Sequence, residues 1–400
     1  MAPSTSSRQP LWLRAEKKEF ERRSALTPTT ARKLIDAGFD ISVERDEQRI
    51  FDDEEFEKVG CKLVDNWTWE NAPLDTPILG LKELPVEKTP IRHTHIQFAH
   101  CYKQQGGWAE VLDRFIQGHG LLYDLEFLQD ENGRRVAAFG FHAGFAGAAA
   151  ACLALHAQVM SDGKERLGPL EPYPNEDELV NEVKSKFSSV EDKLGRPVRV
   201  LVIGALGRCG RGAVSFFQKA GIKDENICQW DMRETAKGGP FQEIIDVDIF
   251  VNCIYLSHKI PHFVDKESIK AAGAKRNLAV IADVSCDTTN PNNPIPLYDI
   301  NTTFDKPTVD VDTSSSGGPV MTVVSIDHLP TLLPRESSEA FSHDLLPTLL
   351  QLPDRQNARV WKEAEALFNK KRDEAIAELK SRDSSYTING TNGTNGANGH

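Results

Sequence analysis

Residues 199–217 read RVLVIGALGRCGRGAVSFF, and this stretch decides the fold. The apolar run Val200–Ile203 predicts a buried strand, the glycines at 204, 207, 210 and 212 predict a tight turn, and apolar residues then recur at helical spacing. A strand, a glycine turn and a helix let the backbone approach a pyrophosphate, whose charge meets the free N–H groups and the positive dipole end of the helix. The spacing is G-x-x-G-x-x-G rather than G-x-G-x-x-G, so the motif alone is only moderately specific.

A carboxylate follows the next predicted strand, Ile227–Trp230. Asp231 stands at about the interval at which an acidic residue holds the adenosine ribose hydroxyls, and a carboxylate there disfavours a 2′-phosphate. The pattern therefore predicts an NAD site, although Arg233 weakens the preference for NAD over NADP. The alternative is a glycine turn that serves only the packing of a helix on a sheet.

Composition limits the class of protein. The chain has 400 residues, of which 40% are hydrophobic, and this is enough for two domains with separate cores. A formal net charge of −12 argues against nucleic acid or an anionic membrane as a partner, because either requires a basic surface. No stretch approaches the apolar length of a membrane span, and residues 1–10 lack an apolar segment. We therefore expect a cytoplasmic monomer that acts on small molecules.

Cysteines and histidines were considered as metal ligands. Seven cysteines are scattered without a C-x-x-C pair, so neither a zinc site nor a disulfide framework is indicated. The segment HTHIQFAHCYK, residues 93–103, carries three histidines, but His93 and His95 share one face of a short strand while His100 lies beyond its end. No nearby Cys or Glu completes a tetrahedral set, and we expect no metal. His100, at a strand exit, is either an acid or base or a structural histidine.

Strands and helices alternate through most of the chain. The first 125 residues predict an α/β lobe. In it, Thr27 caps a helix that begins at Pro28. Before this helix, five basic residues fall within the ten positions 14–23, in a predicted loop. Asn132 and Gly133 predict a hairpin between strands at 121–128 and 135–139. Downstream alternation predicts a doubly wound parallel sheet, in which ligands gather at the carboxyl ends of the strands. The expected sheet strands are residues 11–14, 41–44, 77–81, 200–203, 227–230, 247–255, 278–287 and 320–330.

Together these pieces resemble the fungal saccharopine dehydrogenase family (NAD, L-lysine-forming). The resemblance runs from about Leu11 to Phe368, and it is carried by GLKE (80–83), HIQFAHCYK (95–103), GRRVAAFGF (133–141), IGALGRCG (203–210), VNCIYL (251–256), SIDHLPTLLPRE (325–336) and FSHDLLP (341–347). It implies an α/β fold similar to that of alanine dehydrogenase and transhydrogenase, in which two Rossmann-like lobes with parallel sheets flank a cleft and the chain returns to its first lobe. The expected domains are a substrate and catalytic lobe (1–140), an NAD-binding Rossmann domain (141–330), a helical return to the first lobe (331–382) and a disordered Asn/Gly tail (383–400).

The resemblance also implies an activity and a set of site residues. Members of the family oxidise saccharopine with NAD and water and release L-lysine, 2-oxoglutarate and NADH. Lys82 matches the base and His100 the group that handles water; the alternative for Lys82 is a simple ion pair with Glu83. The expected substrate-binding residues are Arg23, Lys82, Gln105, Arg135, Phe139, Ser285, Cys286 and Asp287. The expected cofactor-binding residues are Arg134, Gly207, Arg208, Asp231, Thr235, Tyr255, Val284, Ile326, Asp327, His328 and Leu329.

Two other functions stay open at this point. An alanine dehydrogenase-like deaminase would use the same lysine and histidine on a smaller substrate. A catalytically silent NAD-binding regulator would keep Asp231 and the glycines, although the presence of Lys82 and His100 argues against it. Cys209 and Cys253 both lie in the matching strings, and we hypothesise that they can oxidise to a disulfide that weakens NAD binding.

Overall fold

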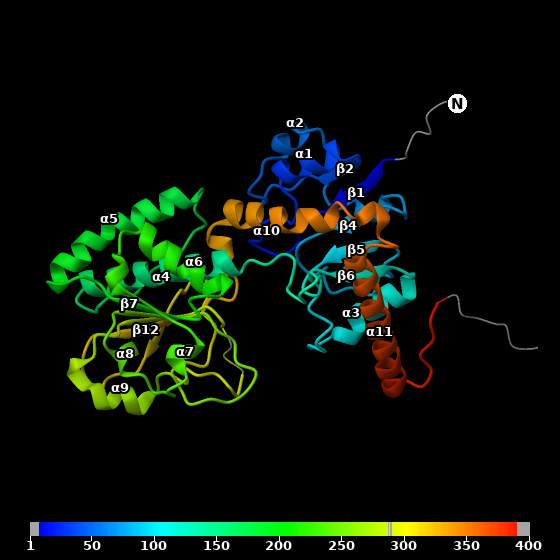
Figure 1. Ribbon diagram of the computed structural model, residues 1–400. Coiled ribbons are helices and arrows are strands. Elements are labelled where there is room, and N and C mark those ends of the chain that lie inside the picture. The colour runs from blue at the N-terminus through cyan, green and yellow to red at the C-terminus, as the bar shows by residue number, and fades with distance from the viewer. Residues whose placement is uncertain (1–7, 287, 289, 390–400) are drawn as a thin grey trace, which may run out of the picture. The chain divides into compact units, whose positions relative to one another are not determined.

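The computed structural model describes residues 8–286, 288 and 290–389. The chain divides into two compact units, which Figure 1 shows: the first comprises Met1–Ala138 and Ser338–His400, and the second comprises Phe139–Ser337. Within the described residues, each unit contains a six-stranded sheet. The chain leaves the first unit and returns to it at its C-terminal end, so the expected α/β class with two sheets and a returning chain is confirmed.

The sheet of the first unit is parallel throughout, in the order β3-β2-β1-β4-β5-β6. Because parallel strands end at the same edge, the residues that follow β1, β4, β5 and β6 lie along one edge of this sheet. Its strands are β1 (Gln9–Leu13), β2 (Phe39–Glu44), β3 (Lys62–Val64), β4 (Ile78–Leu79), β5 (Thr94–Gln97) and β6 (Leu121–Asp124). Its helices are α1 (Pro28–Asp36), α2 (Asp53–Lys58), α3 (Trp108–Gly118) and α11 (Arg359–Arg382), and α10 (Pro334–Leu349) crosses from the second unit into the first.

Helix α1 begins where the sequence predicts. Thr27 is its N-cap, and the Thr27 side chain accepts the backbone N–H of Thr30. Pro28 occupies the first turn, where a missing N–H costs nothing because that group has no partner within the helix. The capping motif is local, and it fixes the start of the helix without help from distant residues.

The C-terminal helix α11 packs within the first unit. The rings of Phe115 on α3 and Phe368 on α11 lie 6.3 Å apart, and Ala375 is buried in the same cluster. Nearer its start, Trp361 is fully buried, and its indole nitrogen donates to the carbonyl oxygen of Thr348 at 3.2 Å. The apolar face that the sequence leaves without a local partner is therefore covered by the first sheet and its helices.

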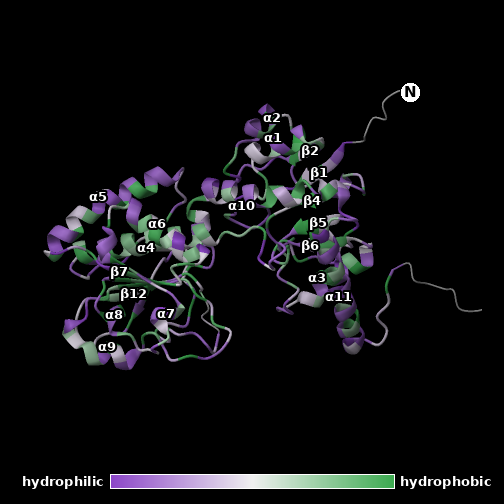
Figure 2. Cartoon of the chain, in the orientation of Figure 1, coloured by the Kyte–Doolittle hydropathy of each residue, from purple (hydrophilic) through white to green (hydrophobic). Residues whose placement is uncertain are grey.

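The sheet of the second unit has the order β11-β12-β10-β9-β7-β8, and only β11 in it runs antiparallel to its described neighbour. Consecutive strands diverge on either side of β7, which places the topological switch point between β7 and β9, where such sheets bind ligands. Figure 2 shows hydrophobic residues along these strands and hydrophilic residues on α5. The strands are β7 (Val200–Ile203), β8 (Ile227–Trp230), β9 (Ile249–Asn252), β10 (Val280–Asp283), β11 (Val309–Val311) and β12 (Met321–Val324). The helices are α4 (Gly140–Met160), α5 (Glu176–Leu194), α6 (Arg208–Lys219), α7 (Met232–Thr235), α8 (Gln242–Ile245) and α9 (Lys266–Ala272).

Helix α4 corrects the expectation that no stretch has the apolar length of a membrane span. By length and composition this 21-residue helix could cross a membrane. In the structure 72% of its most apolar window is buried, and the ring of Phe145 packs edge-on against Phe216 of α6 at 5.0 Å. The apolar composition of α4 is therefore that of a helix enclosed by its own unit.

The hairpin expected around Gly133 forms only in part. The turn is present, with φ of +72° at Gly133 and an antiparallel bridge between Gln129 and Arg135. No described strand continues through residues 136–139. The Asp130 carboxylate accepts the backbone N–H groups of Asn132 and Arg134 and so helps to close the turn. Beyond the bridge, backbone pairing reaches the Val136 N–H, which donates to the Leu128 carbonyl oxygen at 2.9 Å.

Two glycines bring the backbones of α4 and α6 into contact. A Cβ on Gly212 would lie 1.9 Å from the carbonyl oxygen of Phe141, and a Cβ on Gly144 would lie 1.8 Å from that of Cys209. We expect Gly212→Ala to lower the free energy of unfolding of the second unit by about 1–3 kcal/mol or more, because neither backbone can retreat. Urea unfolding followed by tryptophan fluorescence measures this. Gly168→Ala, where a Cβ meets open space, is the control and should change stability by less than about 1 kcal/mol; equal losses would contradict the steric argument.

Candidate active site

Lys82 follows β4, at the carboxyl edge of the first sheet, and is half-buried. Burial lowers the pKa of its ammonium group, and the nearby positive charge of Arg23 lowers it further. The carboxylates of Glu21 and Glu83 oppose this shift but do not reverse it. A base that deprotonates an amine must itself be neutral, and a lowered pKa makes the neutral form of Lys82 more abundant.

His100 follows β5, the neighbouring strand, and adopts a φ of +50°. Its ring stacks on Phe98 with centroids 6.2 Å apart, and its Nε2 lies 3.8 Å from Oε2 of Glu83. Burial lowers the pKa of His100, while Glu83 raises it and Lys82 lowers it. The imidazole is therefore biased toward the neutral form, which can accept a proton from water.

Two glutamates join the cationic residues at this edge. Oε1 of Glu83 lies 3.0 Å from Nζ of Lys18. Oε1 of Glu126, two residues beyond β6, accepts from Lys103 at 2.7 Å and from Arg135 at 3.0 Å. Glu126 therefore connects Arg135 to the exit of β6, the strand that pairs with β5.

The remaining expected substrate residues lie in different settings. Arg23 is 4% exposed and forms a bidentate pair with Glu21, with contacts of 2.8 and 2.7 Å. Gln105 uses its Oε1 to accept the backbone N–H of Lys103 at 3.1 Å. Phe139 precedes α4 and belongs to the second unit. The planar fork of Arg23 thus already holds a carboxylate of its own chain.

The other two histidines of the 93–103 segment are buried and separate from His100. Nε2 of His93 lies 2.9 Å from the carbonyl oxygen of Ala72. His95 is fully buried and packs edge-on against Trp69 at 4.7 Å, and burial holds its pKa well below the usual range. In the part of the chain that the structure describes, no group of three or more His, Cys, Asp or Glu side chains is arranged to hold a metal ion.

The glycine turn in the second unit is closed by its own backbone. Gly204 has φ of +84°, and a Cβ there would lie 2.5 Å from the Ile254 side chain. A Cβ on Gly210 would lie 2.1 Å from the carbonyl oxygen of Gly204. Helix α6 then begins at Arg208 with Gly207 as its N-cap, which provides no side-chain oxygen for the first N–H groups. The twelve-residue helix therefore offers its N-terminal N–H groups to an anion, which fits a dinucleotide pyrophosphate.

Asp231 lies beside this turn, directly after β8. Its Oδ2 accepts the backbone N–H of Leu206 at 3.2 Å, and its Oδ1 accepts that of Met232 at 2.8 Å. The Thr235 hydroxyl donates to the carbonyl oxygen of Asp231 at 3.0 Å. A carboxylate tied to the turn in this way has lone pairs left for the two hydroxyls of a ribose.

A buried polar cluster closes the exit of β10. Asp283 is fully buried, and its Oδ1 accepts from the Ser285 hydroxyl at 2.6 Å and from Nδ2 of Asn252 at 3.0 Å. Its Oδ2 accepts from the Tyr298 hydroxyl at 2.5 Å. Cys286 has φ of +50°, and burial raises the pKa of its thiol. The expected residue Asp287 lies outside the described residues.

The other expected cofactor residues differ in exposure. Tyr255 is 69% exposed, whereas Ile326 and Leu329 are buried and Val284 is half-buried. The His328 ring packs edge-on against Phe304 at 5.0 Å. Asp327 is exposed, and so is Arg134 in the first unit, whose backbone N–H donates to Asp130.

Cys209 and Cys253 have free thiols that contact each other. The hydrogen bond with Cys209, together with burial, raises the pKa of the Cys253 thiol well above its usual range. The hypothesis that their oxidation weakens NAD binding stays a prediction.

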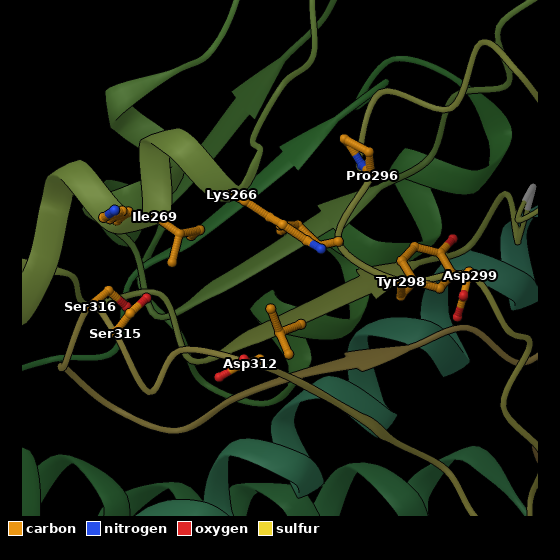
Figure 3. Close-up of a pocket in the computed structure, with 11 residues that line it drawn as sticks. Lys266, Ile269, Pro296, Tyr298, Asp299, Asp312, Ser315 and Ser316 are labelled. Atoms are coloured by element: carbon orange, nitrogen blue, oxygen red, sulfur yellow. The ribbon is translucent and has the colours of Figure 1, made fainter.

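A hollow of about 490 Å³ lies elsewhere in the second unit, beside α9 and β11, and is shown in Figure 3. The Lys266 side chain extends from α9 toward Tyr298 and Asp299. None of the expected site residues lines this hollow. The chemistry-bearing side chains gather instead at the carboxyl edges of the two sheets.

Comparison with known proteins gives the class. Residues 12–146 match the family model for the N-terminal domain of alanine dehydrogenase/PNT. The fold is similar to that of a solved L-alanine dehydrogenase, with a TM-score of 0.60 over 92% of this chain and 99% of that chain at 15% identity. The fold is therefore of the alanine dehydrogenase type, and its glycine turn and Asp231 are features of a dinucleotide-binding domain.

Curated relatives then give the family. The saccharopine dehydrogenase (NAD+, L-lysine-forming) of Yarrowia lipolytica is 59% identical over 360 residues, which cover 90% of this chain and 96% of that protein. The Neurospora crassa protein of the same name is 59% identical over 379 residues, or 95% of this chain and 98% of that protein. The chain belongs to the saccharopine dehydrogenase family (NAD+, L-lysine-forming), and the family resemblance is confirmed. The names of these relatives do not support the alanine deaminase or the silent regulator.

Sequence reasoning missed some of the acidic residues at both sites. Glu126 and Asp283 were not identified, and Glu83 was considered only as an ion-pair partner of Lys82. The signal was available for two of them, because Asp283 ends β10 and Glu126 lies two residues beyond β6, on the carboxyl edges where ligands gather. Glu83 lies farther out, four residues beyond β4. The role of Glu21 had no such signal, since its pairing with Arg23 depends on the path of the loop after β1.

The buried Asp124 at the end of β6 makes stability depend on pH. It is 2% exposed; burial raises its pKa from 3.8 to about 7, and the hydrogen bond from the Glu126 N–H offsets this only in part. Because the folded pKa lies above the unfolded one, the stabilisation present at low pH is lost as pH rises through about 7. As the pH rises from about 5.5 to about 8.5, the free energy of unfolding of the unmodified protein should therefore fall by up to about 2 kcal/mol relative to that of Asp124→Asn, which carries no titrating group at this position. Urea unfolding at both pH values measures this. Asp36→Asn, on the exposed surface of α1, is the control, and the same trend in both variants would contradict the assignment.

Proposed function

We propose that this protein oxidises L-saccharopine with NAD+ and water to L-lysine, 2-oxoglutarate and NADH. The observation that carries the proposal is the 59% identity to saccharopine dehydrogenase over 96% of the Yarrowia lipolytica protein. The first unit adds the chemistry that such a reaction needs, since Lys82 and His100 follow adjacent parallel strands and both have lowered pKa values.

The cofactor fits the second unit. Gly207 and Arg208, at the start of α6, would hold the pyrophosphate, and Asp231 would accept the adenosine ribose hydroxyls. The remaining expected contacts are those of Arg134, Thr235, Tyr255, Val284, Ile326, Asp327, His328 and Leu329. NAD+ supplies a hydride acceptor, and the protein residues supply binding, orientation and proton transfer.

The substrate carries three carboxylates, and the expected contacts include two arginines. Arg135 is paired with Glu126, two residues beyond β6. A substrate carboxylate could replace Glu126 as the partner of the Arg135 guanidinium. Arg23 is held by Glu21, so its role would be to present positive charge from a fixed guanidinium. Gln105, Phe139, Ser285 and Cys286 complete the proposed substrate residues.

Lys82 is proposed as the base that accepts the proton of the secondary ammonium. Hydride can leave the glutaryl carbon only when the nitrogen carries a lone pair, so deprotonation must come first. The neutral amine of Lys82 takes this proton, and its lowered pKa makes that form available near neutral pH. Loss of hydride then leaves an imine carbon that water can attack.

His100 is proposed to activate that water. A neutral imidazole takes a proton from water as its oxygen bonds to the imine carbon, and the imidazolium then gives the proton to the departing lysine nitrogen. Glu83, with its Oε2 3.8 Å from Nε2 of His100, stabilises the imidazolium. As the carbon–nitrogen bond breaks, the hydroxyl on the same carbon gives its proton to the imidazole, which is neutral again, and the products are L-lysine and 2-oxoglutarate.

The cellular setting is also part of the proposal. Seven free thiols, all in described residues, are what a reducing compartment favours, and we propose a cytoplasmic location. We further propose that the protein acts as a monomer on small molecules, without a nucleic acid or membrane partner. The net charge of −12 supports the latter, because both surfaces are anionic.

Asp231 should set the choice of cofactor. Its carboxylate repels a 2′-phosphate, so the protein should strongly prefer NAD+ over NADP+, and Asp231→Ala should relax the preference. The ratio of kcat/KM for the two cofactors measures this. Asp224→Ala, an exposed acid before β8, serves as control and should keep the ratio. Equal efficiency of the unmodified protein with both cofactors would refute the role of Asp231.

Turnover should depend on Lys82 and His100. Purified protein with NAD+ and saccharopine should produce NADH, followed by absorbance, and alanine in place of saccharopine should not. Lys82→Met and His100→Gln should each lower kcat by roughly 10²–10⁴-fold, the usual size of an acid–base contribution, with the Kd for NAD+ nearly unchanged. Lys17→Met and His119→Gln, exposed or bonded elsewhere in the first unit, are controls. A variant that keeps full turnover across the pH range shows that its residue was wrongly assigned.

A further inference from the structure

The backbone around Lys82 lies beyond the end of the strand ladder. β4 pairs with β1 only through Ile78 and Leu79, and the last ladder contact on that side is the Arg14 N–H to the Leu79 carbonyl at 2.9 Å. From there a side chain replaces the strand. Oε1 of Glu16 accepts the N–H of Leu81 at 2.7 Å, and Oε2 accepts the N–H of Lys82 at 3.0 Å. Glu16 thus continues the pairing that β1 abandons.

Arg14 binds the carbonyl group of the same residue, Lys82. Its guanidinium lies 3.2 Å from Oε2 of Glu16, and its Nη2 donates to the carbonyl oxygen of Lys82. The same nitrogen reaches Oε1 of Gln97, the last residue of β5, at 3.2 Å. The Arg14–Glu16 ion pair therefore bonds both the N–H and the C=O group of Lys82. Through Gln97 it also contacts β5, the strand that precedes His100.

Gly80 makes room for this arrangement. A Cβ at Gly80 would lie 2.3 Å from Nε of Arg14 and 2.4 Å from its Cζ. The guanidinium therefore lies directly against the backbone of the strand exit. Only a residue without a side chain permits that approach.

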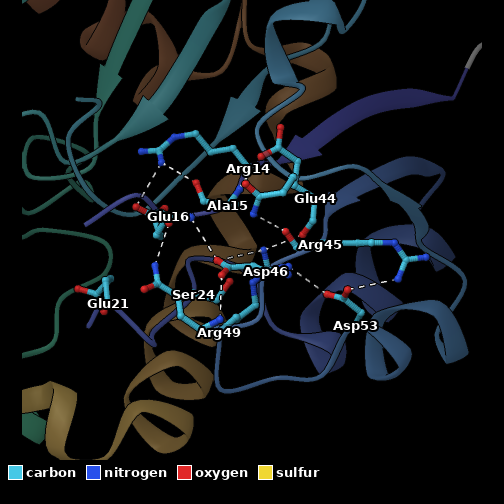
Figure 4. A network of polar contacts seen from close by, with 12 residues as sticks. Arg14, Ala15, Glu16, Glu21, Ser24, Glu44, Arg45, Asp46, Arg49 and Asp53 are labelled. Carbon is cyan, nitrogen blue, oxygen red and sulfur yellow. Dashed lines mark hydrogen bonds and ion pairs between the residues drawn. The ribbon is translucent and has the colours of Figure 1, made fainter. Parts of the chain in front are cut away.

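The pair is buried. Arg14 is 1% exposed and Glu16 is 8% exposed. Figure 4 shows the two side chains together, with the network continuing from the Glu16 N–H to Oδ2 of Asp46 at 3.2 Å. A buried ion pair contributes little net stability compared with apolar residues of the same volume, but it does fix the geometry of what it bonds. The role of the Arg14–Glu16 pair is therefore better explained by the backbone groups that it bonds than by its contribution to stability.

We propose that Arg14 and Glu16 are positioning residues that hold the backbone of Lys82, and through Gln97 the exit of His100, in the geometry of the reaction. This inference rests on the proposed role of Lys82 as the base. A base must lie within hydrogen-bonding reach of the proton it takes, and a shift of about 1 Å can cost on the order of 100-fold in rate. The pair acts on turnover only through the residues it positions.

Glu16→Gln tests this proposal. Glutamine keeps the size, but its amide oxygen can accept only one of the two N–H groups at good geometry, and its NH₂ group faces Lys82 N–H and Arg14. We expect kcat for saccharopine to fall on the order of 10–100-fold, with the Kd for NAD+ unchanged within about twofold. The acid-side pKa of the kcat/KM profile should rise, because a released Lys82 regains water while Glu21, Glu83, Arg23 and Lys18 stay nearby.

The controls separate positioning from loss of stability. In a Lys82→Met background, Glu16→Gln should have little further effect on kcat, because Glu16 itself bonds the Leu81 and Lys82 N–H groups and the contact with Gln97 is made by Arg14. Glu44→Gln removes another fully buried carboxylate of the first unit, one that accepts N–H groups of residues 67–69. It should lower the unfolding midpoint without moving the pH profile. Arg14→Lys is a second test, because a lysine cannot hold the Lys82 carbonyl and Gln97 together. It should lower kcat and shift the pH profile as Glu16→Gln does, and it can be measured if Glu16→Gln fails to fold.

The outcomes are distinguishable. An additive loss in the double variant, an unchanged pH profile in Glu16→Gln and Arg14→Lys, or the same profile shift in Glu44→Gln would overturn the positioning role. Full turnover in Lys82→Met would instead refute the proposed base, and this result is seen before Arg14 or Glu16 is changed. A non-additive loss with a shifted profile and intact NAD+ binding supports the proposal.

Discussion

Carboxylates that accept backbone N–H groups beyond the strand ends hold the functional segments of both units. Glu16 does this at the exit of β4, Asp231 at the glycine turn and Asp283 at Ser285. Functional residues begin where the strand ladder stops, and the N–H groups there need other partners. A carboxylate has two oxygens at a fixed spacing, and bonds to a charged acceptor are stronger than neutral ones. The strand exits therefore keep their geometry without further strand.

Burial also creates electrostatic strain that the chain balances with cations. Burial raises the pKa of Glu16 even with Arg14 beside it, so the ion pair compensates the loss of water only in part. Lys82 shows the converse: burial lowers its pKa, Arg23 adds to the shift, and Glu21 opposes it. Because Arg23 and Glu21 form a bidentate pair, their effects on Lys82 largely offset each other and burial leads. The depth of this strand exit thus tunes the proposed base more than any single charge does.

How much of the fold the sequence predicts depends on how local the decisive contacts are. The Thr27 cap and the glycine turn were predicted correctly because a few neighbouring residues determine them. The prediction for the hairpin at Gly133 was wrong in its second strand: a few backbone bonds form beside the turn, up to Val136 N–H to the Leu128 carbonyl, but no described strand covers residues 136–139. Helix α4 has the composition of a membrane span, and only its enclosure by α6 and the sheet shows it to be a core helix. The composition of a helix shows only that it needs an apolar environment. Whether that environment is a membrane or the protein core is decided by tertiary packing.

The site was predictable to the same extent. The carboxyl-end rule brings Lys82 and His100 to neighbouring strand exits, and the family strings identify both. Arg14 belongs to a basic cluster that the sequence places at the end of a strand and in the loop that follows, and the structure buries its side chain. No local pattern states which cation of such a cluster loses its water, because that depends on a strand far along the chain. One local signal existed in Gly80, since a glycine at a strand exit indicates that another group approaches closely, and that group is the Arg14 guanidinium.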